Sequence, residues 1–211
     1  MSRAVLVELY EATNGTGWKE ADRANWLTGE PCADAWEGVT CESGNVTELS
    51  LYGVGMTGTL PPSLAELGPW LDVLLYGGSD HLSGTLPDFA AFGKLRSLNG
   101  CCTSISGTIG TEVGLMTTLE NQLSFQAADS SGRYMSGTLP TELGALDKVT
   151  QLVLYFQNYI SGTVPTELGD LGRAAAQGST SALAARYTRS LSGTLPTQLG
   201  RLTRVEFENT N

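Results

Sequence analysis

The chain has 211 residues, of which 41% are hydrophobic, and its formal net charge is −10. This length suits one domain or one short array of repeats, and the composition supplies enough apolar residues for a core. An acidic chain without a basic stripe is a poor partner for nucleic acid or anionic membranes, and no apolar run approaches the roughly 20 residues of a membrane span.

The N-terminal segment begins with the sequence AVLVELYEATNG. Val5, Leu6, Leu9 and Tyr10 are spaced as on one face of a helix, which predicts an amphipathic helix. Glutamates interrupt the apolar stretch and no small-residue cleavage site follows it, so we expect no signal peptide. Two Asn-x-Thr sequons, at 14–16 and 45–47, are weak indications of secretion because such triplets are frequent by chance.

Beyond residue 45 a short phrase, Ser-Gly-Thr-Leu-Pro or a close variant, occurs six times. Its glycine stands at positions 58, 84, 107, 137, 162 and 193, so the steps are 26, 23, 30, 25 and 31 residues. A period in this range is typical of a solenoid, in which each repeat forms one coil. A single coil cannot bury its apolar face, whereas stacked coils bury it against their neighbours.

Each phrase has a short apolar segment before it and a Leu-Gly segment after it. Most of the seven segments that precede a phrase or end the chain alternate in hydrophobicity, as in Leu49 and Leu51 or Val73 and Leu75, which predicts inward-facing pairs on about seven parallel strands. The segments after the phrases, such as TELGAL from Thr141, predict a single helical turn capped by Thr or Ser.

This unit resembles the plant-type leucine-rich repeat, LxxLxLxxNxLSGxIPxxLGxL. The stretch VTQLVLYFQNYISGTVPTELGDL at Val149–Leu171 matches it almost position for position. For residues 46–211 the resemblance implies an α/β solenoid, a right-handed superhelix of about six repeats and a partial last coil. Its parallel strands would line the concave face.

Residues 1–45 are similar to the N-terminal cap of the same family, on the evidence of Trp26, Cys32, Trp36 and Cys41. The resemblance implies a helical cap that covers the open end of the first coil, and a disulfide between the two cysteines. The alternative is that both cysteines are reduced and buried.

The motifs of common enzymes do not occur in the sequence. His81 is the only histidine, no base is paired with a nucleophile, and no phosphate-binding glycine motif is found. We therefore expect no catalytic residue, metal or cofactor. The adjacent Cys101 and Cys102 are interpreted as ordinary strand cysteines, with a metal or redox role as the alternative.

The resemblance implies a non-catalytic module that binds a protein or peptide across its concave face, as receptor-kinase ectodomains and polygalacturonase inhibitors do. It also favours an extracellular or cell-surface location. The alternative is a structural or surface-binding solenoid that takes cell wall, polysaccharide or ice, against which the irregular repeat lengths argue.

Stacking of the strand segments places aromatic and polar side chains in two outward columns. Tyrosine and arginine are favoured as interface anchors because they combine a large contact area with a polar tip. The predicted ligand-binding residues are Tyr52, Tyr76, Gln126, Tyr155, Phe156, Arg186 and Tyr187. The alternative is a ladder of tyrosines that only packs along the sheet.

Overall fold

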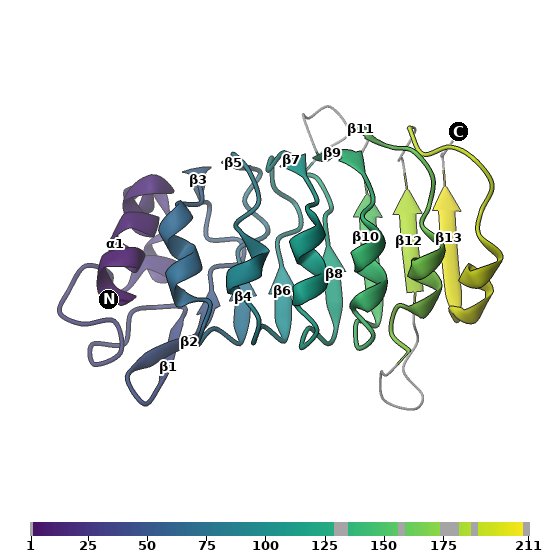
Figure 1. The fold of residues 1–211 in the computed structure, drawn as a ribbon. Helices are drawn as coiled ribbons and strands as arrows, with labels where there is room; N and C mark the ends of the chain where they lie inside the picture. The colour runs from purple at the N-terminus through teal and green to yellow at the C-terminus, as the bar shows by residue number, and fades with distance from the viewer. Residues whose placement is uncertain (1, 129–134, 156–158, 174–181, 187–189, 209–211) are drawn as a thin grey trace.

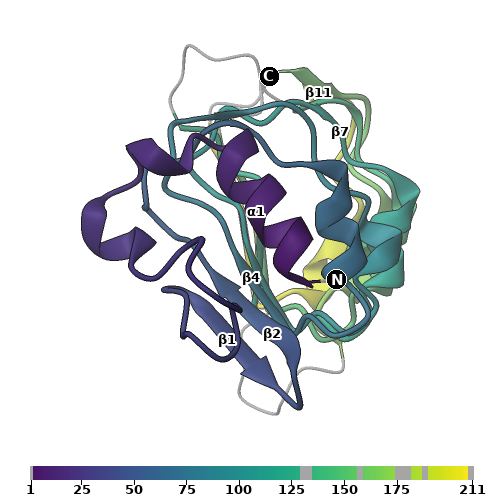
Figure 2. The same ribbon diagram turned by 90° about the vertical axis from the view of Figure 1, so that its left-hand side faces the viewer.

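The computed structural model of the chain describes residues 2–128, 135–155, 159–173, 182–186 and 190–208. The chain winds into a row of stacked coils that run from a helical N-terminal cap to the last strand (Figure 1). Viewed along the row, each coil has a layer of parallel strands on one side and a layer of short helices on another (Figure 2). In the described residues no helix is long and apolar enough to cross a membrane.

The layer of longer strands contains the seven parallel strands that the sequence predicts. In chain order these are β2 (Asn45–Ser50), β4 (Val73–Leu75), β6 (Ser97–Asn99), β8 (Gln122–Ser124), β10 (Gln151–Tyr155), β12 (Ala182–Arg186) and β13 (Arg204–Glu208). Together with the antiparallel β1 (Val39–Glu42) they form two four-stranded sheets, β1-β2-β4-β6 and β8-β10-β12-β13. The backbone N–H of Cys102 donates to the carbonyl of Gln126 at 2.8 Å, which joins the two sheets.

The six glycine phrases form a second ladder along the solenoid. Its strands are β3 (Thr57–Thr59), β5 (His81–Ser83), β7 (Gly107–Thr108), β9 (Met135–Thr138) and β11 (Tyr159–Ser161). They pair as β3-β5 and β7-β9-β11, and isolated bridges at Thr85–Ser106 and Gly162–Leu191 extend the pairing. The Thr of one phrase pairs with the Ser of the next, as Thr59 does with Ser83 and Thr108 with Ser136, so neighbouring phrases keep a constant offset of two residues even though the coils differ in length.

The helical turns after the phrases are 3-10 helices. They span Pro62–Leu67, Phe89–Ala91, Thr111–Leu115, Thr141–Ala145, Thr166–Asp170 and Thr197–Arg201. The predicted Thr caps are wrong, because Pro140 holds the N-cap position before Thr141 and no side chain caps that helix. The hydroxyl of Thr141 bonds instead to the carboxylate of Glu142 at 3.1 Å. Only Asp88 accepts a capping bond, from the N–H of Ala90, among the helices described.

The N-terminal cap is held together by α1 (Ser2–Ala12) and a group of aromatic rings. Val5, Leu6, Leu9 and Tyr10 are buried, as the helical spacing predicts. The Tyr10 ring lies 5.2 Å from Trp18, and further contacts join Trp18, Trp26 and Trp36. Each of these three indoles donates its N–H to a backbone carbonyl, so their polar atoms are satisfied inside the core.

The Cys32–Cys41 disulfide is confirmed, with the two Cα atoms 5.6 Å apart. It joins the loop between Trp26 and Trp36 to β1 (Val39–Glu42), which pairs antiparallel with β2. The cap thereby covers the edge of the first parallel strand. The division of the chain at residues 45 and 46 coincides with the start of β2 and stays a prediction.

Candidate ligand-binding face

We call the outward-facing side chains of the seven parallel strands the concave strand face. Ser50 pairs with Leu75 and Leu75 with Asn99, while Tyr155 pairs with Arg186 and Arg186 with Glu208. Extending these pairings along the strands gives one outward column that crosses every coil. Its members are Tyr52, Gly77, Cys101, Gln126, Tyr155, Arg186 and Glu208.

Tyr76 does not belong to this face, and the prediction for it is wrong. Leu49 pairs with Leu74, so Leu74 and Tyr76 point inward and Val73 and Leu75 point outward. The predicted register of this strand is therefore shifted by one residue, which moves every side chain to the opposite face. Tyr76 is 3% exposed, and burial raises the pKa of its hydroxyl well above its usual range.

Tyr52 occupies the N-terminal end of the outward column and remains half exposed, at 51%. Its ring passes over Gly78, and its hydroxyl lies 3.7 Å from the thiol sulfur of Cys101, two coils away. This contact raises the pKa of Tyr52 to about 12, chiefly because the hydrogen bond to Cys101 disfavours the phenolate. Glycines at positions 77 and 78 leave the space that lets the ring reach across the intervening coil.

Cys101 and Cys102 are free and partly exposed beside Tyr52. Their sulfur atoms lie 3.3 Å apart, and Cys102 has a left-handed backbone with φ of 59°. Burial, followed by the hydrogen bond to Cys101, raises the pKa of Cys102 to about 11. A thiol with a raised pKa is a poor nucleophile and a poor metal ligand at neutral pH. In the described part of the chain no three His, Cys, Asp or Glu side chains lie close enough together to hold a metal ion.

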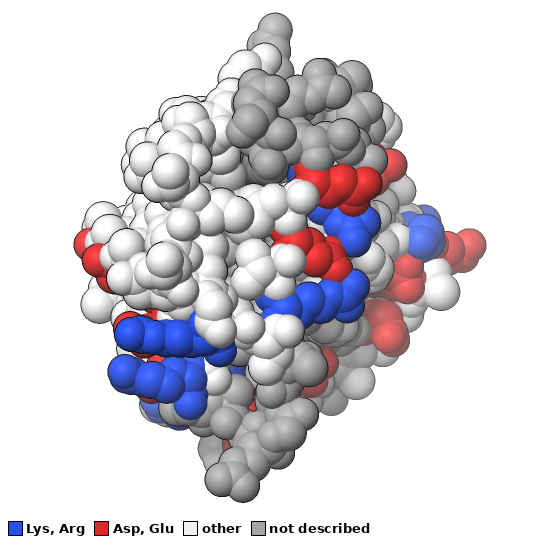
Figure 3. Space-filling model, turned by 90° about the vertical axis from the view of Figure 1, so that its right-hand side faces the viewer, with Lys and Arg blue, Asp and Glu red and all other residues white. Residues whose placement is uncertain are grey.

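The C-terminal end of the face carries a cluster of mutually bonded groups. The guanidinium of Arg186 lies 5.3 Å from the centre of the Tyr155 ring, and it pairs with Glu206 at 2.7 Å and Glu208 at 3.3 Å. Arg204 pairs with Glu206 as well. These bonds, that to Arg186 first, lower the pKa of Glu206. Basic and acidic groups accordingly alternate at this end of the molecule (Figure 3).

The middle of the face is uncharged and has a column of short side chains. Ser124, Val153 and Ala184 follow one another across β8, β10 and β12, and their neighbours cover them. The longer side chains of Gln126 and Tyr155 stand beside this column and are partly exposed. The hydroxyl of Ser124 is buried without a hydrogen-bond partner in the described residues. Phe156 and Tyr187, also predicted for this face, lie outside the described residues.

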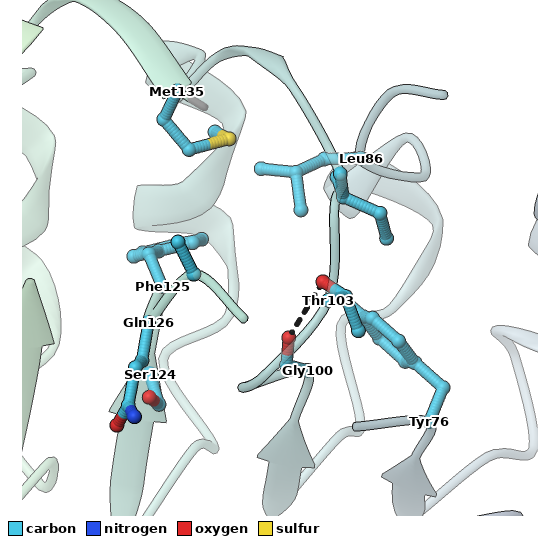
Figure 4. A pocket seen from close by; sticks show the side chains of 10 residues that line it. Tyr76, Leu86, Gly100, Thr103, Ser124, Phe125, Gln126 and Met135 are labelled. Carbon is cyan, nitrogen blue, oxygen red and sulfur yellow. Dashed lines mark hydrogen bonds between the residues drawn. The ribbon is translucent and has the colours of Figure 1, made fainter. Parts of the chain in front are cut away.

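A cavity between β6 and β8 lies behind this face. Tyr76, Gly100 and Thr103 line one side, and Ser124, Phe125 and Gln126 line the other (Figure 4). Its volume is only about 10 Å³, which at most suits one water molecule. The cavity is therefore too small for an organic ligand, and recognition at this face depends on its exposed side chains.

A second regular surface follows the glycine phrases, and the sequence pattern alone does not identify it as a site. In the second to sixth phrases the Ser hydroxyl donates to the Gly carbonyl of the coil before it, from Ser83 to Gly58 at 3.0 Å through Ser192 to Gly162 at 3.4 Å. The Thr side chains alternate with these serines and are exposed. We call them the threonine ladder, which comprises Thr59, Thr85, Thr108, Thr138, Thr163 and Thr194.

Glycine fixes the spacing of the threonine ladder. Gly137 has φ of +83°, and the absence of a side chain there leaves room for the methyl group of Thr108, which would lie 3.2 Å from an added Cβ. Gly84, Gly162 and Gly193 contact the threonine of the preceding coil in the same way. All six phrases share this Thr, although the packing of the apolar residues does not require it. The shared Thr is therefore the feature of the sequence that indicates this surface.

Comparison with known proteins gives the fold a context. No protein-family model matches the chain. The protein STRUBBELIG of Arabidopsis thaliana is 38% identical over 65 residues, which are 30% of this chain and 8% of that protein. The chain thus corresponds to a small part of this relative.

Solved structures match over almost the whole chain at low identity. A plant ice-binding protein has a TM-score of 0.77 and 22% identity, with 99% of this chain and 63% of that chain covered. The leucine-rich repeat ectodomain of the receptor kinase GASSHO1/SCHENGEN3 from Arabidopsis thaliana, in complex with CASPARIAN STRIP INTEGRITY FACTOR 2, has a TM-score of 0.75 and 21% identity. The match covers 99% of this chain and 23% of that ectodomain.

These likenesses agree with the repeat, the parallel strands and the capped first coil. Receptor ectodomains of this kind are a non-catalytic fold, in line with the absence of enzyme motifs from the sequence. The chain has the fold of a leucine-rich repeat solenoid and is similar to the ectodomains of plant receptor kinases.

Proposed function

We propose that the chain is a non-catalytic recognition module that binds a protein or peptide across the concave strand face. Parallel strands about 4.8 Å apart bring side chains from distant parts of the sequence into adjacent positions. A ligand that runs across the strands can therefore contact several coils at once. The related ectodomain of GASSHO1/SCHENGEN3 was solved in complex with CASPARIAN STRIP INTEGRITY FACTOR 2, which supports a recognition role for this fold.

The observation that carries the proposal is the packing of Tyr155 against Arg186. Both side chains are partly exposed, and Arg186 is held by the Tyr155 ring and two carboxylates at once. Anchors that are already ordered lose less conformational entropy when a ligand binds. Tyrosine and arginine are also among the residues that most often dominate binding energy.

The chemistry of the face indicates the character of the ligand. An uncharged middle, with the partly exposed side chain of Gln126, suits a main chain or polar side chains. The C-terminal end carries positive and negative side chains within one cluster. It therefore favours a ligand with both an acidic and a basic group at that end over a uniformly acidic or uniformly basic ligand. Tyr52 gives a second aromatic anchor at the opposite end of the column.

A photo-crosslinking experiment tests the proposal and identifies the ligand at the same time. Benzoylphenylalanine replaces Tyr155 in one variant and exposed Glu142, on the layer of 3-10 helices, in another. We expect the first variant to crosslink a defined protein or peptide from the source material, and the second to give no such product.

Titrations with the crosslinked ligand then assign the anchors. Truncation of a true anchor, by Tyr155→Ala or Arg186→Ala, is expected to weaken binding by about 2 kcal/mol or more, roughly thirtyfold in affinity. Glu142→Ala is the matched control. If folded Tyr52→Ala, Tyr155→Ala and Arg186→Ala variants all bind as tightly as the parent, the ligand does not use this face.

The threonine ladder favours a second candidate function, binding to a regular surface such as ice. Six exposed threonines recur once per coil, and the pairing of neighbouring phrases keeps the same two-residue offset despite the varying repeat lengths that argue against such a role. Each threonine presents both a methyl group and a hydroxyl group. The similar solved structure of a plant ice-binding protein supports the same candidate.

Growth of ice crystals in a supercooled solution distinguishes this function from peptide recognition. Thr138→Lys places a long charged side chain in the middle of the ladder, and Thr166→Lys places one on the exposed 3-10 layer as a control. We expect the parent and the control to slow recrystallisation and Thr138→Lys to lose the effect. Equal activity of both variants, or inactivity of the parent, would exclude the ladder as an ice-binding surface.

A further inference from the structure

One tryptophan of the chain differs from the other three. Trp18, Trp26 and Trp36 are buried and each donates its indole N–H to a carbonyl. Trp70 is 52% exposed, and its indole N–H has no partner in the described part of the chain. A large aromatic ring with an unused donor in water contributes little to the core, so its position calls for another explanation.

Trp70 lies in a groove at the edge where the parallel strands begin. The groove has a volume of about 520 Å³, within the range of small-molecule sites. The tip of the β1–β2 hairpin, with Asn45, forms one wall. The turns before β4, β6 and β8 contribute Trp70, Lys94 and Thr118 at steps of 24 residues. We call this site the Trp70 groove.

The polar groups of the Trp70 groove are balanced in charge. Asp72 and Arg96 form a two-point ion pair, with Arg96 Nε 2.6 Å from Asp72 Oδ1, and the Lys94 ammonium lies 5.1 Å from the centre of the Trp70 ring. With Glu42, two carboxylates face two cations. A phosphate or nucleic acid would require an excess of positive charge, which this lining lacks.

The same lining suits a sugar. A pyranose ring has a face of C–H groups that stacks on an indole, and its hydroxyls both donate and accept hydrogen bonds. Arg96 and Lys94 donate, Asp72 accepts, and the hydroxyl oxygen of Thr118 can accept because its proton is directed to the Leu95 carbonyl at 2.8 Å. Lys94 covers the ring through a flexible chain, so its ammonium can move to a sugar hydroxyl and stay hydrogen-bonded.

We propose that the Trp70 groove binds a neutral oligosaccharide, one ring of which stacks on Trp70 while its hydroxyls bond to Asp72 and Arg96. The site is separate from the concave strand face and from the threonine ladder. Oligosaccharide binding at the Trp70 groove can therefore be tested independently of the proposed function.

Calorimetric titration and tryptophan fluorescence test the site with three neutral probes, cellohexaose, xylohexaose and mannohexaose. The protein is produced in bacteria, because a glycan on Asn45 of the sequon at 45–47 would occupy the groove. We expect at least one probe to bind and to change the fluorescence. Trp70→Ala should weaken that binding by about tenfold or more, whereas Trp70→Phe should retain part of it.

The controls separate stacking from other causes. Leu115→Ala removes an equally exposed apolar side chain outside the groove and should bind as the parent does. Asp72→Asn keeps the shape of the groove and should weaken binding without changing the thermal unfolding midpoint by much. Absence of binding to all three probes, or unchanged binding by folded Trp70→Ala, would overturn the proposal. It would also be overturned if only the acidic hexagalacturonate bound, and added salt abolished that binding.

Discussion

The ring of Tyr76 fills the space that a side chain at position 100 would need. A Cβ placed on Gly100 would lie 2.3 Å from the Cζ atom of Tyr76, far closer than real Cβ contacts. Both residues belong to the inward columns of adjacent coils, where other coils carry leucine, phenylalanine or alanine. The glycine thus compensates for the large tyrosine in the neighbouring coil.

We expect Gly100→Ala to lower the free energy of unfolding by about 1–3 kcal/mol, because the buried ring cannot move away without disturbing its neighbours. Denaturant titrations of Gly100→Ala, Tyr76→Leu and the double variant measure the coupling. The double variant should be more stable than the sum of the single effects predicts, by about 0.5 kcal/mol or more. Strict additivity would show that the two side chains do not share this space.

The sequence predicts the architecture well because the same pattern of strand, phrase and helical turn occurs in several repeats. Alternation in ELSLYG and QLVLYF, together with the phrases, identifies the stacked parallel strands and the inward positions of Leu49 and Leu152. In DVLLYG three apolar residues are consecutive, so alternation does not define the inward face. Only pairing with the neighbouring coil decides it, which is why the predicted position of Tyr76 is wrong.

The sites are harder to predict because they depend on relations between coils. The contact of Tyr52 with Cys101 requires the glycines of the coil between them. The Trp70 groove combines a hairpin tip with turns from three coils, and none of these segments carries a recognisable motif. The threonine ladder, in contrast, can be predicted from the phrase itself once the phrases of successive coils are known to pair with each other.

Leu152 lies in the most regular coil and is fully buried. We expect Leu152→Ala to destabilise the protein by about 2–5 kcal/mol, since the lost apolar contacts leave a cavity in a packed core. Leu115, which is 58% exposed, provides the control, and Leu115→Ala should change stability by less than about 0.5 kcal/mol. Chemical denaturation that gives equal effects for the two variants would contradict the inward position of Leu152.

The Cys32–Cys41 disulfide closes a short loop in the cap. Replacement of both cysteines by serine is expected to reduce stability by about 2–3 kcal/mol, because the unfolded chain regains conformational freedom. Peptide mapping without reductant, on protein made in an oxidising compartment, should recover the two peptides joined. Free thiols at both positions in folded protein from that compartment would refute the bridge.

The ion pair between Asp72 and Arg96 predicts a pH dependence. The hydrogen bond from Arg96 lowers the pKa of Asp72, so the folded state holds this proton less tightly than the unfolded chain does. The contribution of the pair is therefore complete above the ordinary carboxyl range and is lost as the pH falls through the lowered value. Its size is modest because both side chains are partly in water.

NMR titration of the Asp72 carboxyl carbon measures this effect directly. Arg96→Gln should raise the pKa of Asp72 toward its usual value, because the amide offers no charge. Arg201→Gln, which removes an exposed ion pair with Asp170 elsewhere on the surface, should leave the titration of Asp72 unchanged. A pKa of Asp72 that is the same in the parent and in Arg96→Gln would mean that the pair does not form in solution.

The regularity of the threonine ladder depends on the positive φ of its glycines. At Gly137, with φ of +83°, alanine would adopt an unfavourable backbone conformation and would press on the methyl group of Thr108 at 3.2 Å. We expect Gly137→Ala to cost about 1–2 kcal/mol, mainly from the backbone. Gly93→Ala is the control, because no atom lies within 4 Å of an added Cβ there and its φ is not positive.

A second variant separates the two causes. Thr108→Ala removes the methyl contact but leaves the backbone of residue 137 unchanged, so Gly137→Ala in that background should still cost most of its original amount. If Thr108→Ala instead abolished the cost, the contact with the preceding coil would be the reason for glycine at this position. A third outcome would be an unchanged free energy of unfolding in Gly137→Ala, with changed methyl chemical shifts of Thr138 and Thr163. That result would show that the glycine maintains the exposed surface and does not stabilise the fold.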